Sequence, residues 1–489
     1  MTQSPSPISI FETVKLQPMN RRSVSLLVMA ILSLYSIAKG QKNNKPNVIF
    51  ILADDLGYGD LGCYGQQKIR TPHIDQLAAE GMKFTQFYSG TSVCAPSRAS
   101  LMTGLHTGHT PVRGNVGMEP EGQFPIPDNA FTIAELFKQA GYTTGDFGKW
   151  GLGPVGSTGD PIKQGFDRFY GYNCQSLAHN YFPDHLWNNQ LRVDLPNTFN
   201  NQTQYAGDLI QRQALDFMAQ NKNKPFFLYL SYTLPHAALQ LPNGDAHLEY
   251  YKKQFNEQPV DLKPWNGKGY QPNAYPKAAY AAMVQKMDDY VGQVMQQLVS
   301  LGLDKNTLVI FTSDNGPHRE GGNNPEFFNS GGGLRGIKRD LYEGGMREPM
   351  IARWPAMIKP AQVSTQTGAF WDFLPTFASL TKQAIPAGID VLSILPTLTA
   401  KGKQEQHEYY YWEFHENGGR QAVRMGDWKG VRYNASTNPS GLIELYNLST
   451  DLAEKNNLAS TRPDLVARMA EIMKTAHVEN QNFPFFKTK

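Results

Sequence analysis

The sequence predicts an α/β protein with a large, mostly parallel sheet between layers of helices, and two observations support this expectation. Several apolar runs lack the polar alternation of half-exposed strands, which is typical of parallel strands buried on both faces. Helical patterns lie between these runs, and this alternation favours a sheet with helices on both sides. The length of 489 residues allows one large domain and a smaller one.

Four apolar runs are the expected strands, and each is followed by polar residues. The runs cover residues 48–53, 142–147, 226–232 and 308–312. In the same order they are followed by Asp54 and Asp55, by Lys149, by His236, and by Asp314 and Asn315. Because sheets of this kind bind ligands beyond the carboxyl ends of their strands, we expect these side chains to meet at one edge.

We expect a catalytic α/β domain at 44–395 and a smaller C-terminal α+β subdomain at 396–489. In the first domain, Thr132 and Glu135 form a capping box that begins a helix ending near Gly141, and 278–301 is a long amphipathic helix. In the subdomain, short strands of an antiparallel sheet are expected at 409–413, 420–423 and 428–431, with a closing helix at 462–474.

Residues 1–40 are interpreted as a secretory signal. Arg21 and Arg22 precede an apolar run at 24–38, which is shorter than the roughly 20 residues of a membrane-spanning helix. A signal that begins at Met19 would be more typical, so we expect that translation starts there and that residues 1–18 are not part of the protein. We expect an exported bacterial protein, periplasmic or extracellular, with no stable membrane insertion after the signal is removed.

Net charge and cysteine count narrow the possible functions. The formal net charge of +3 is carried by residues 1–40, so the remaining chain is near neutral and a broad basic surface for nucleic acid is not expected. The three cysteines are Cys63, Cys94 and Cys174, an odd number that leaves one for another use in an exported protein. Whether Cys63 and Cys174 are bridged stays open, because sequence gives no geometry.

Asp54, Asp55, Asp314 and Asn315 are candidate metal ligands. Three carboxylates at one edge would repel one another without a cation, and oxygen ligands suit Ca²⁺ or Mg²⁺ rather than Zn²⁺. Either pair alone could be a simple turn. Two pairs at one expected edge favour a metal, and we expect Ca²⁺, although ligand type alone does not separate it from Mg²⁺.

Cys94 precedes an apparent helix at 99–103. A helix N-terminus presents free N–H groups and the positive end of the helix dipole, which favour an anion. Arg98 would lie on the first turn, where its guanidinium can bind two anion oxygens. An unmodified thiol is a poor partner for a hard metal, and the alternative is a buried, inert cysteine.

Cys94-x-Pro-Ser-Arg98, followed by Leu101-x-Thr-Gly104, resembles the signature of the type I, formylglycine-dependent sulfatases of the alkaline-phosphatase-like superfamily. The resemblance runs from Pro46 into the C-terminal subdomain. It implies that a separate maturation enzyme oxidises Cys94 to formylglycine, which hydrates to a geminal diol. One hydroxyl would bind the metal and attack sulfur, and the second would then expel sulfate.

The resemblance implies roles for three further residues. Lys149 and Lys338 are similar to the two lysines that bind sulfate in the family. The lysine that Lys149 resembles also helps to hold the formylglycine. His236 is similar to the histidine that contacts sulfate and serves the leaving oxygen. Fixed cationic donors around a sulfuryl group stabilise the negative charge that spreads in the transition state. Taken singly, each Lys would be a solvated charge and the His a structural residue.

The chain departs from the family pattern at one position. The common Gly-Lys-Trp-His is here Gly148-Lys-Trp-Gly151, so the histidine that is the usual base for expelling sulfate is absent. His179 is our candidate for its replacement, with binding of a sugar hydroxyl as the alternative. The attack half of the cycle is therefore better supported than the release half.

By analogy, we expect a sulfated, galacto-configured saccharide as substrate, either an algal galactan or a glycosaminoglycan fragment. Residues 412–415 and 418–421 contain types that hold carbohydrate, but the same types form the core of a small sheet. Two other functions stay open. One is a phosphomonoester or phosphonate hydrolase on the same scaffold, and the other is a non-catalytic sulfated-glycan-binding protein, which only Gly151 favours.

Overall fold

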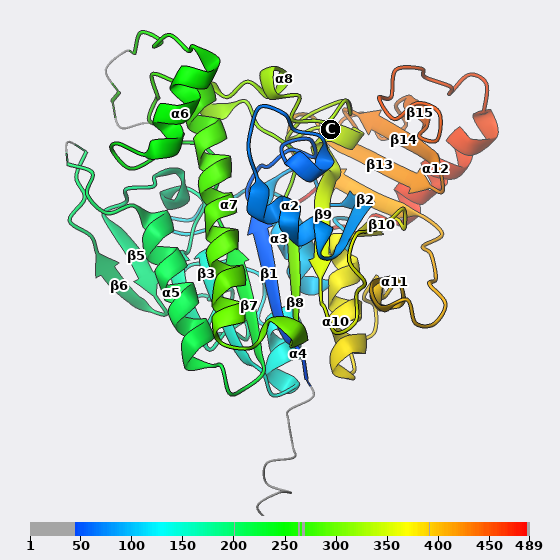
Figure 1. The fold of residues 1–489 in the computed structure, drawn as a ribbon. Coiled ribbons are helices and arrows are strands. Elements are labelled where there is room, and N and C mark those ends of the chain that lie inside the picture. The colour runs from blue at the N-terminus through cyan, green and yellow to red at the C-terminus, as the bar shows by residue number, and fades with distance from the viewer. Residues whose placement is uncertain (1–44, 200, 263–264, 267–268, 391, 487–489) are drawn as a thin grey trace, which may run out of the picture. The chain divides into compact units, whose positions relative to one another are not determined.

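An eleven-stranded sheet organises the chain in the computed structural model, which describes residues 45–489 except 200, 263–264, 267–268, 391 and 487–489. The predicted signal lies outside the described residues. The strand order is β10-β2-β9-β8-β1-β7-β3-β4-β5-β6, with β11 paired to β2 (Figure 1). The strands are β1 (Asn47–Ala53), β2 (Met82–Tyr88), β3 (Thr143–Lys149), β4 (Arg168–Tyr172), β5 (His185–Asn188), β6 (Leu191–Asp194), β7 (Phe226–Ser231), β8 (Thr307–Ser313), β9 (Arg347–Arg353), β10 (Gln362–Ser364) and β11 (Gly368–Ala369).

The middle of this sheet is parallel, which confirms the predicted fold class. β1 pairs in parallel with β7 and β8, and β3 pairs in parallel with β7 and β4. β9 runs antiparallel between β8 and β2, and β5 and β6 form an antiparallel edge. The four predicted strands correspond to β1, β3, β7 and β8, so the polar residues after them lie at neighbouring strand ends.

Helices cover both faces of the sheet (Figure 1). Ile49 and Ile51 of β1 pack in a core with residues of α2 (Pro72–Ala79), α5 (Ala206–Gln220) and α7 (Pro276–Ser300). Phe50 and Leu52 pack in a second core with residues of α3 (Cys94–Thr103), α4 (Ile133–Gln139) and α10 (Phe373–Thr381). Since successive side chains of a strand point to opposite faces, β1 needs apolar residues throughout its length.

The two helices predicted from local patterns are confirmed as α4 and α7. The capping box is present, because Thr132 Oγ1 accepts a hydrogen bond from Glu135 N and Glu135 Oε2 accepts one from Thr132 N. Shorter helices and single turns complete the layers. They are α6 (Ala246–Phe255), α8 (Pro325–Phe328), α9 (Glu343–Met346), α11 (Leu395–Thr399), η1 (Gly62–Tyr64), η2 (Leu177–His179), η3 (Asp304–Asn306), η4 (Glu320–Gly322) and η5 (Phe370–Asp372).

A second, four-stranded antiparallel sheet follows in the C-terminal part. It contains β12 (Tyr410–Phe414), β13 (Arg420–Met425), β14 (Trp428–Tyr433) and β15 (Ile443–Asn447), and α12 (Pro463–Thr475) packs against it. The predicted short strands and closing helix are present, and β15 is an additional strand. Trp412 shares a core with Tyr88 of the large sheet, and residues from 45 onward form one compact unit, so a domain boundary at 395 stays a prediction.

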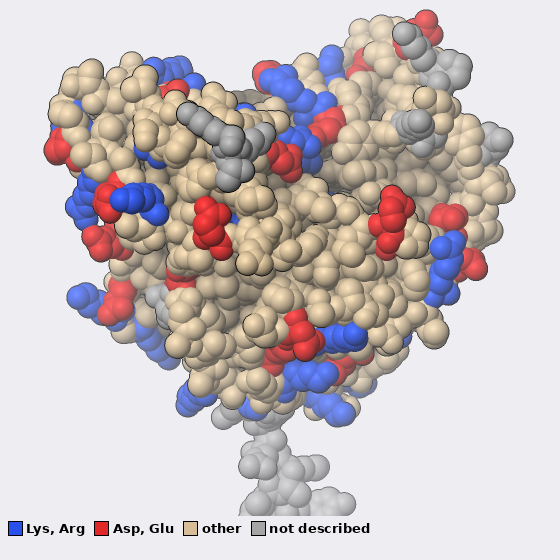
Figure 2. Space-filling model, turned by 180° about the vertical axis from the view of Figure 1, so that it is seen from behind, with Lys and Arg blue, Asp and Glu red and all other residues tan. Residues whose placement is uncertain are grey.

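The distribution of surface charge and the state of the cysteines both bear on the expectations from the sequence. On the face shown in Figure 2, acidic and basic side chains lie in small mixed groups rather than in an extended field of one sign. Cys63, Cys94 and Cys174 are all free, so Cys63 and Cys174 are not bridged. In the part of the chain that the structure describes, every helix is too short or too polar to cross a membrane.

Candidate active site

Neighbouring strand ends bring the predicted site residues together. Cys94 and Arg98 enter from the first turns of α3, and Lys338 enters from the loop before α9. None of the nine predicted residues at this point is more than 5% exposed. They are Asp314 and Asn315 after β8, Asp54 and Asp55 after β1, His236 after β7, Lys149 at the end of β3, and Cys94, Arg98 and Lys338.

The carboxylates of Asp54, Asp55 and Asp314 lie close together. Asp55 has a left-handed backbone, with φ of 64°, at the point where the chain leaves β1. Asp55 N donates a hydrogen bond to Asp314 Oδ1 at 3.1 Å, and Asn315 Nδ2 donates one to Asp55 Oδ1 at 2.6 Å. Burial, followed by the charge of Asp54, raises the pKa of Asp314 to about 7. Additional positive charge at this point would therefore be favourable.

Three cationic side chains surround these acids. Arg98 Nη2 lies 2.9 Å from Asp314 Oδ2, Lys149 Nζ lies 2.6 Å from Asp54 Oδ2, and Lys338 Nζ lies 2.7 Å from Asp55 Oδ2. Burial alone would raise the pKa of Asp54, but Lys149, His236 and Arg98 outweigh it and hold that pKa well below its usual range. Burial alone would lower the pKa of Lys338, but Asp55 raises it. Asp54 and Lys338 are therefore charged at neutral pH.

Cys94 is the first residue of α3 and faces the same acids. Its Sγ lies 3.4 Å from Asp54 Oδ1 and 4.0 Å from Asp55 Oδ1. Burial, followed by the charge of Asp54, raises the pKa of the thiol well above its ordinary value. Because the thiolate is the nucleophilic form of cysteine, an unmodified Cys94 would be a poor nucleophile in this position.

The residues at this edge fit a hard divalent cation. Asn315 Oδ1 is buried and has no hydrogen-bond partner within the described residues. Asp54, Asp55, Cys94 and His236 offer ligand atoms that lie within 4.8 Å of one another. The donors are mostly carboxylate and amide oxygens, which Ca²⁺ and Mg²⁺ prefer. The geometry thus brings together the predicted ligands, while leaving the identity of the ion open.

His236 and His179 stand on the side of the site near Lys338. His236 Nε2 lies 3.2 Å from Lys338 Nζ and 3.4 Å from Asp55 Oδ2. The ring of His179 stacks on that of His236, with centroids 5.0 Å apart and an interplanar angle of 8°. Burial and Lys338 lower the pKa of His236 well below its usual range, and burial, Lys149 and Lys338 lower that of His179 to about 3. Both rings are therefore neutral at pH 7.

Two residues of this region were not predicted from the sequence. His318 Nδ1 lies 3.3 Å from Glu320 Oε2, and Glu320 Oε1 lies 3.7 Å from Lys338 Nζ. The ring of His318 also stacks on that of His236 at 5.8 Å. Both residues follow Asp314 and Asn315 within a few positions of the chain, and this proximity is the signal that could have identified them.

The structure gives a physical reason for glycine at position 151. Gly151 has a φ of 72°, a left-handed conformation that is costly for other residues. A Cβ atom there would also lie 2.7 Å from Gln175 Nε2. A histidine at this position would therefore require both the local backbone and the Gln175 side chain to change.

The aromatic segment of the C-terminal sheet is core. Trp412 and Glu413 in β12 are fully buried, and Gln421 is 1% exposed. Trp412 packs against Tyr88 and Trp371, and its Nε1 donates a hydrogen bond to Ser89 O. Of the two interpretations of 412–421, the core of a small sheet is therefore the correct one for these buried side chains.

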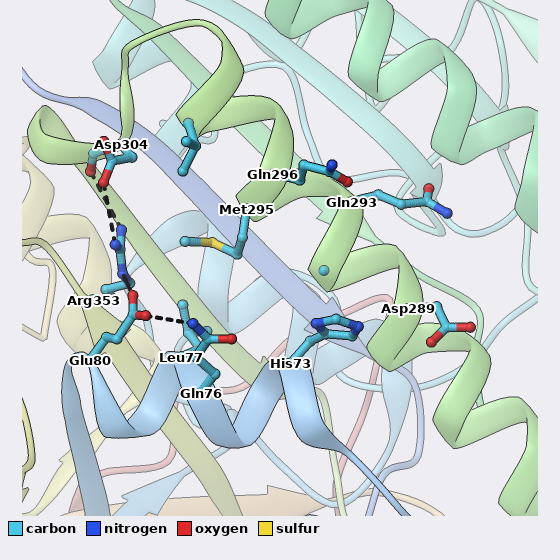
Figure 3. Close-up of a pocket in the computed structure, with 12 residues that line it drawn as sticks. His73, Gln76, Leu77, Glu80, Asp289, Gln293, Met295, Gln296, Asp304 and Arg353 are labelled. Carbon is cyan, nitrogen blue, oxygen red and sulfur yellow. Dashed lines mark hydrogen bonds and ion pairs between the residues drawn. The ribbon is translucent and has the colours of Figure 1, made fainter.

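A cavity of about 710 Å³ between α2 and α7 is separate from this site (Figure 3). His73 and Gln76 on α2 face Gln293 on α7 across it. At one end, Arg353 lies 2.7 Å from Glu80 and 3.5 Å from Asp304. None of the predicted site residues lines this cavity.

The geometry at the strand ends is that of a hydrolase of anionic esters. Buried cations can hold an anionic group, the acidic set can hold a metal, and Cys94 faces the same acids. Several families belong to this class of hydrolases. Comparison with known proteins shows which family the chain belongs to.

The family model described as Sulfatase matches residues 46–383, and one described as N-sulphoglucosamine sulphohydrolase, C-terminal, matches 336–479. The chain belongs to the sulfatase family and is a sulfuric ester hydrolase. It is 33% identical to N-acetylgalactosamine-6-sulfatase of Rattus norvegicus, over 82% of this chain and 74% of the relative. It is 30% identical to N-acetylgalactosamine-6-O-sulfatase of Bacteroides thetaiotaomicron, over 89% of this chain and 94% of the relative.

Solved structures agree with this assignment. The crystal structure of Ps i-CgsB has a TM-score of 0.76 and 30% identity, covering 90% of this chain and 95% of the other. The structure of the same protein in complex with k-i-k-neocarrahexaose has a TM-score of 0.76 and 29% identity, covering 91% and 95% of the two chains.

Proposed function

We propose that this sulfatase hydrolyses an O-sulfate ester on a galacto-configured saccharide, through the geminal diol of a formylglycine made from Cys94, with Ca²⁺ beside it. The position of Cys94 carries the proposal, because its Sγ lies 3.4 Å from Asp54 at the start of α3. The high pKa of the thiol supports a modified residue as nucleophile. Relatives named for N-acetylgalactosamine, and a similar structure that holds neocarrahexaose, support a sugar substrate.

The bound metal would supply a Lewis acid that stabilises the attacking oxygen and screens the sulfate. Asp54, Asp55, Asp314 and Asn315 would hold it, and Arg98 keeps two of these carboxylates in place through its ion pairs at 2.9 and 3.4 Å. Binding of Ca²⁺ can be measured without activity, by calorimetry on the protein treated with a chelator. We expect Asn315→Leu to weaken this binding, and Asn323→Leu, on an asparagine that follows η4, to leave it unchanged.

Lys149 and Lys338 would bind the sulfate oxygens from two sides of Cys94. His236 Nδ1 hydrogen-bonds to the carbonyl oxygen of Ala237, so this nitrogen carries the proton and Nε2 is the acceptor. Nε2 faces Lys338 Nζ at 3.2 Å, where it can take up a proton and pass it to the leaving oxygen. We propose His179, stacked on His236, as the base for sulfate release in place of the histidine that is absent at Gly151.

Maturation by a separate enzyme and export to the periplasm or the extracellular space complete the proposal. The test is the mass of the peptide containing Cys94 after expression in a host with the maturation enzyme. Conversion should lower the mass by the difference between SH₂ and O, in parallel with sulfate release from 6-O-sulfated galactose and N-acetylgalactosamine. An unmodified Cys94 in a protein that releases sulfate would contradict the diol mechanism, and a modified protein that releases phosphate but no sulfate would contradict the substrate class.

A further inference from the structure

Two connected cavities adjoin the active site beyond the carboxyl ends of β4 and β7. One has a volume of about 410 Å³ and the other of about 550 Å³, both within the range of roughly 300–1,000 Å³ that is usual for small-molecule sites. Asn180, Trp265 and Gln271 line both, so the two spaces form one groove. We call this groove the amide groove, after the side chains described below.

The amide groove reaches the reaction centre through His179. This residue lines the smaller cavity, and its ring stacks on His236, which contacts Lys338 and Asp55. Tyr270 lies against both histidine rings, with centroids 4.9 Å from His179 and 5.7 Å from His236. A ligand whose sulfate lies beside Lys338 would therefore extend past His179 and Tyr270 into the groove.

The walls of the amide groove suit a sugar ring. Phe199 is 56% exposed, and its ring lies 5.3 Å from that of Trp265 at an angle of 36°, so two aromatic faces border the larger cavity. Aromatic faces pack on the apolar face of a pyranose, and amides bind its hydroxyl groups.

The amide side chains are held in position by one another. Gln271 Oε1 accepts hydrogen bonds from Gln240 Nε2 at 2.5 Å and from Gln202 Nε2 at 2.9 Å. Gln240 Oε1 in turn accepts one from Tyr181 N at 2.8 Å. The Nε2 atom of Gln271 is an amide donor of the kind that binds a hydroxyl oxygen.

The described lining of the amide groove contains no Asp, Glu, Lys or Arg. Its one titratable side chain is His179. Moving a carboxylate or a second sulfate from water to such walls carries a desolvation cost that no cation of the described lining offsets. Neutral hydroxyl groups need only the hydrogen bonds that the amides provide.

We propose that the amide groove binds the sugar next to the sulfated one, and that this neighbour is an uncharged pyranose rather than a uronic acid. The proposal rests on the proposed function, since it assumes that the sulfated sugar occupies the site at Cys94. It narrows the substrate to saccharides in which sulfated and uncharged sugars are joined.

Three substrates test this proposal through sulfate release. They are 6-O-sulfated galactose as its methyl glycoside, the same sugar linked to galactose, and the same sugar linked to glucuronic acid. We expect kcat/KM for the galactose-linked substrate to exceed that of the monosaccharide and of the uronate-linked substrate about tenfold. Trp265→Ala and Gln271→Ala should remove this advantage through KM and leave the monosaccharide unchanged. The matched control is Tyr250→Ala, which removes an exposed aromatic ring on α6 that lines neither cavity.

The proposal is overturned if the uronate-linked substrate is preferred, or if Trp265→Ala affects the monosaccharide and the disaccharide equally. Calorimetry with an unsulfated galactose tetrasaccharide separates it from the proposed function, because this ligand needs no catalysis. Binding by the wild type that is lost in Trp265→Ala supports the amide groove even without sulfate release. Absence of binding by the wild type contradicts the groove, and failure to release sulfate from all three substrates contradicts the proposed function.

Discussion

Two buried groups of acidic side chains differ in whether neighbouring hydrogen-bond donors and cations satisfy all of their oxygen atoms. Glu413 in β12 accepts hydrogen bonds from Tyr411 OH and His477 at Oε1, both at 2.6 Å, and from His415 at Oε2 at 3.0 Å. Burial would raise the pKa of Glu413, but His415 and His477 outweigh it and lower the pKa to about 2. Both carboxylate oxygens are satisfied, so this group needs no further ligand.

The acids at the strand ends are not balanced in this way. The neighbouring charge of Asp54 adds to burial and raises the pKa of Asp314, while Asn315 Oδ1 has no partner within the described residues. Both regions contain buried acids with cations, so burial and ion pairing alone do not identify a functional site. The second region differs in the unpartnered Oδ1 of Asn315 and the raised pKa of Asp314. The following predictions test whether buried acids away from the strand ends serve stability and those at the strand ends serve catalysis.

Cys94→Ser should have the largest effect, a loss of turnover of about 10⁴-fold or more. Serine can form a sulfate ester but has no second hydroxyl to expel the sulfate. Sulfate release under multiple turnover measures the effect, and Cys63→Ser, at a half-buried free thiol outside the site, should retain activity. Full turnover by Cys94→Ser would refute the diol mechanism.

Lys429→Met alters a third buried group of acids, outside both regions, and should act on stability rather than on turnover. Lys429 Nζ lies 2.9 Å from Glu343 Oε1 and 3.1 Å from Glu454 Oε1, and all three side chains are fully buried. Glu343 keeps Arg347 at 3.1 Å, but Glu454 loses its cation, which should lower the free energy of unfolding by about 3–5 kcal/mol. Urea unfolding measures this loss, and Lys455→Met, at an exposed position, is the control. Unchanged stability together with a lower kcat of the folded variant would contradict a structural role for this third group.

Lys338→Met should lower kcat/KM by about 10²–10³-fold, because it removes a cation that would stabilise the sulfuryl group in the transition state. Sulfate release from the smallest active substrate measures this effect without a contribution from the amide groove. Lys403→Met, at an exposed lysine, should leave kcat/KM unchanged. An equal kcat/KM for Lys338→Met and the wild type would show that Lys338 does not contribute to catalysis.

The sequence predicted those parts of the molecule that depend on local patterns. Uninterrupted apolar runs identified β1 and β8, and the residues after them lie together as predicted, because parallel strands end at the same edge. His318 follows Asn315 by three residues, which was the available local signal, but its place beside His236 depends on the order of β8, β1 and β7 in the sheet. Trp412 was ambiguous for a related reason, since composition cannot tell a buried aromatic from an exposed one.

Glu413→Gln should have the smallest and most pH-dependent effect. A carboxyl whose pKa is lower in the folded protein than in the unfolded chain stabilises the fold above the unfolded pKa, about 4.5, and this contribution is lost as pH falls toward about 2. The wild type should therefore exceed the variant in stability at pH 6 by at most about 3 kcal/mol, and this difference should shrink between pH 4.5 and pH 2.

Thermal unfolding midpoints of both proteins across this pH range measure the difference, with Glu405→Gln, at an exposed carboxylate, as the control. The titration of His477 adds a second pH dependence, at higher pH. Burial would lower its pKa, but the hydrogen bond to Glu413 raises it, so its contribution is complete below its unfolded value of about 6.5 and is lost as pH rises through the folded pKa. The gap between wild type and Glu413→Gln should therefore narrow below pH 4.5 and again above pH 6.5, when the measurements are extended to that side. A gap that is constant with pH would mean that Glu413 stabilises the sheet through packing and neutral hydrogen bonds rather than through its charge.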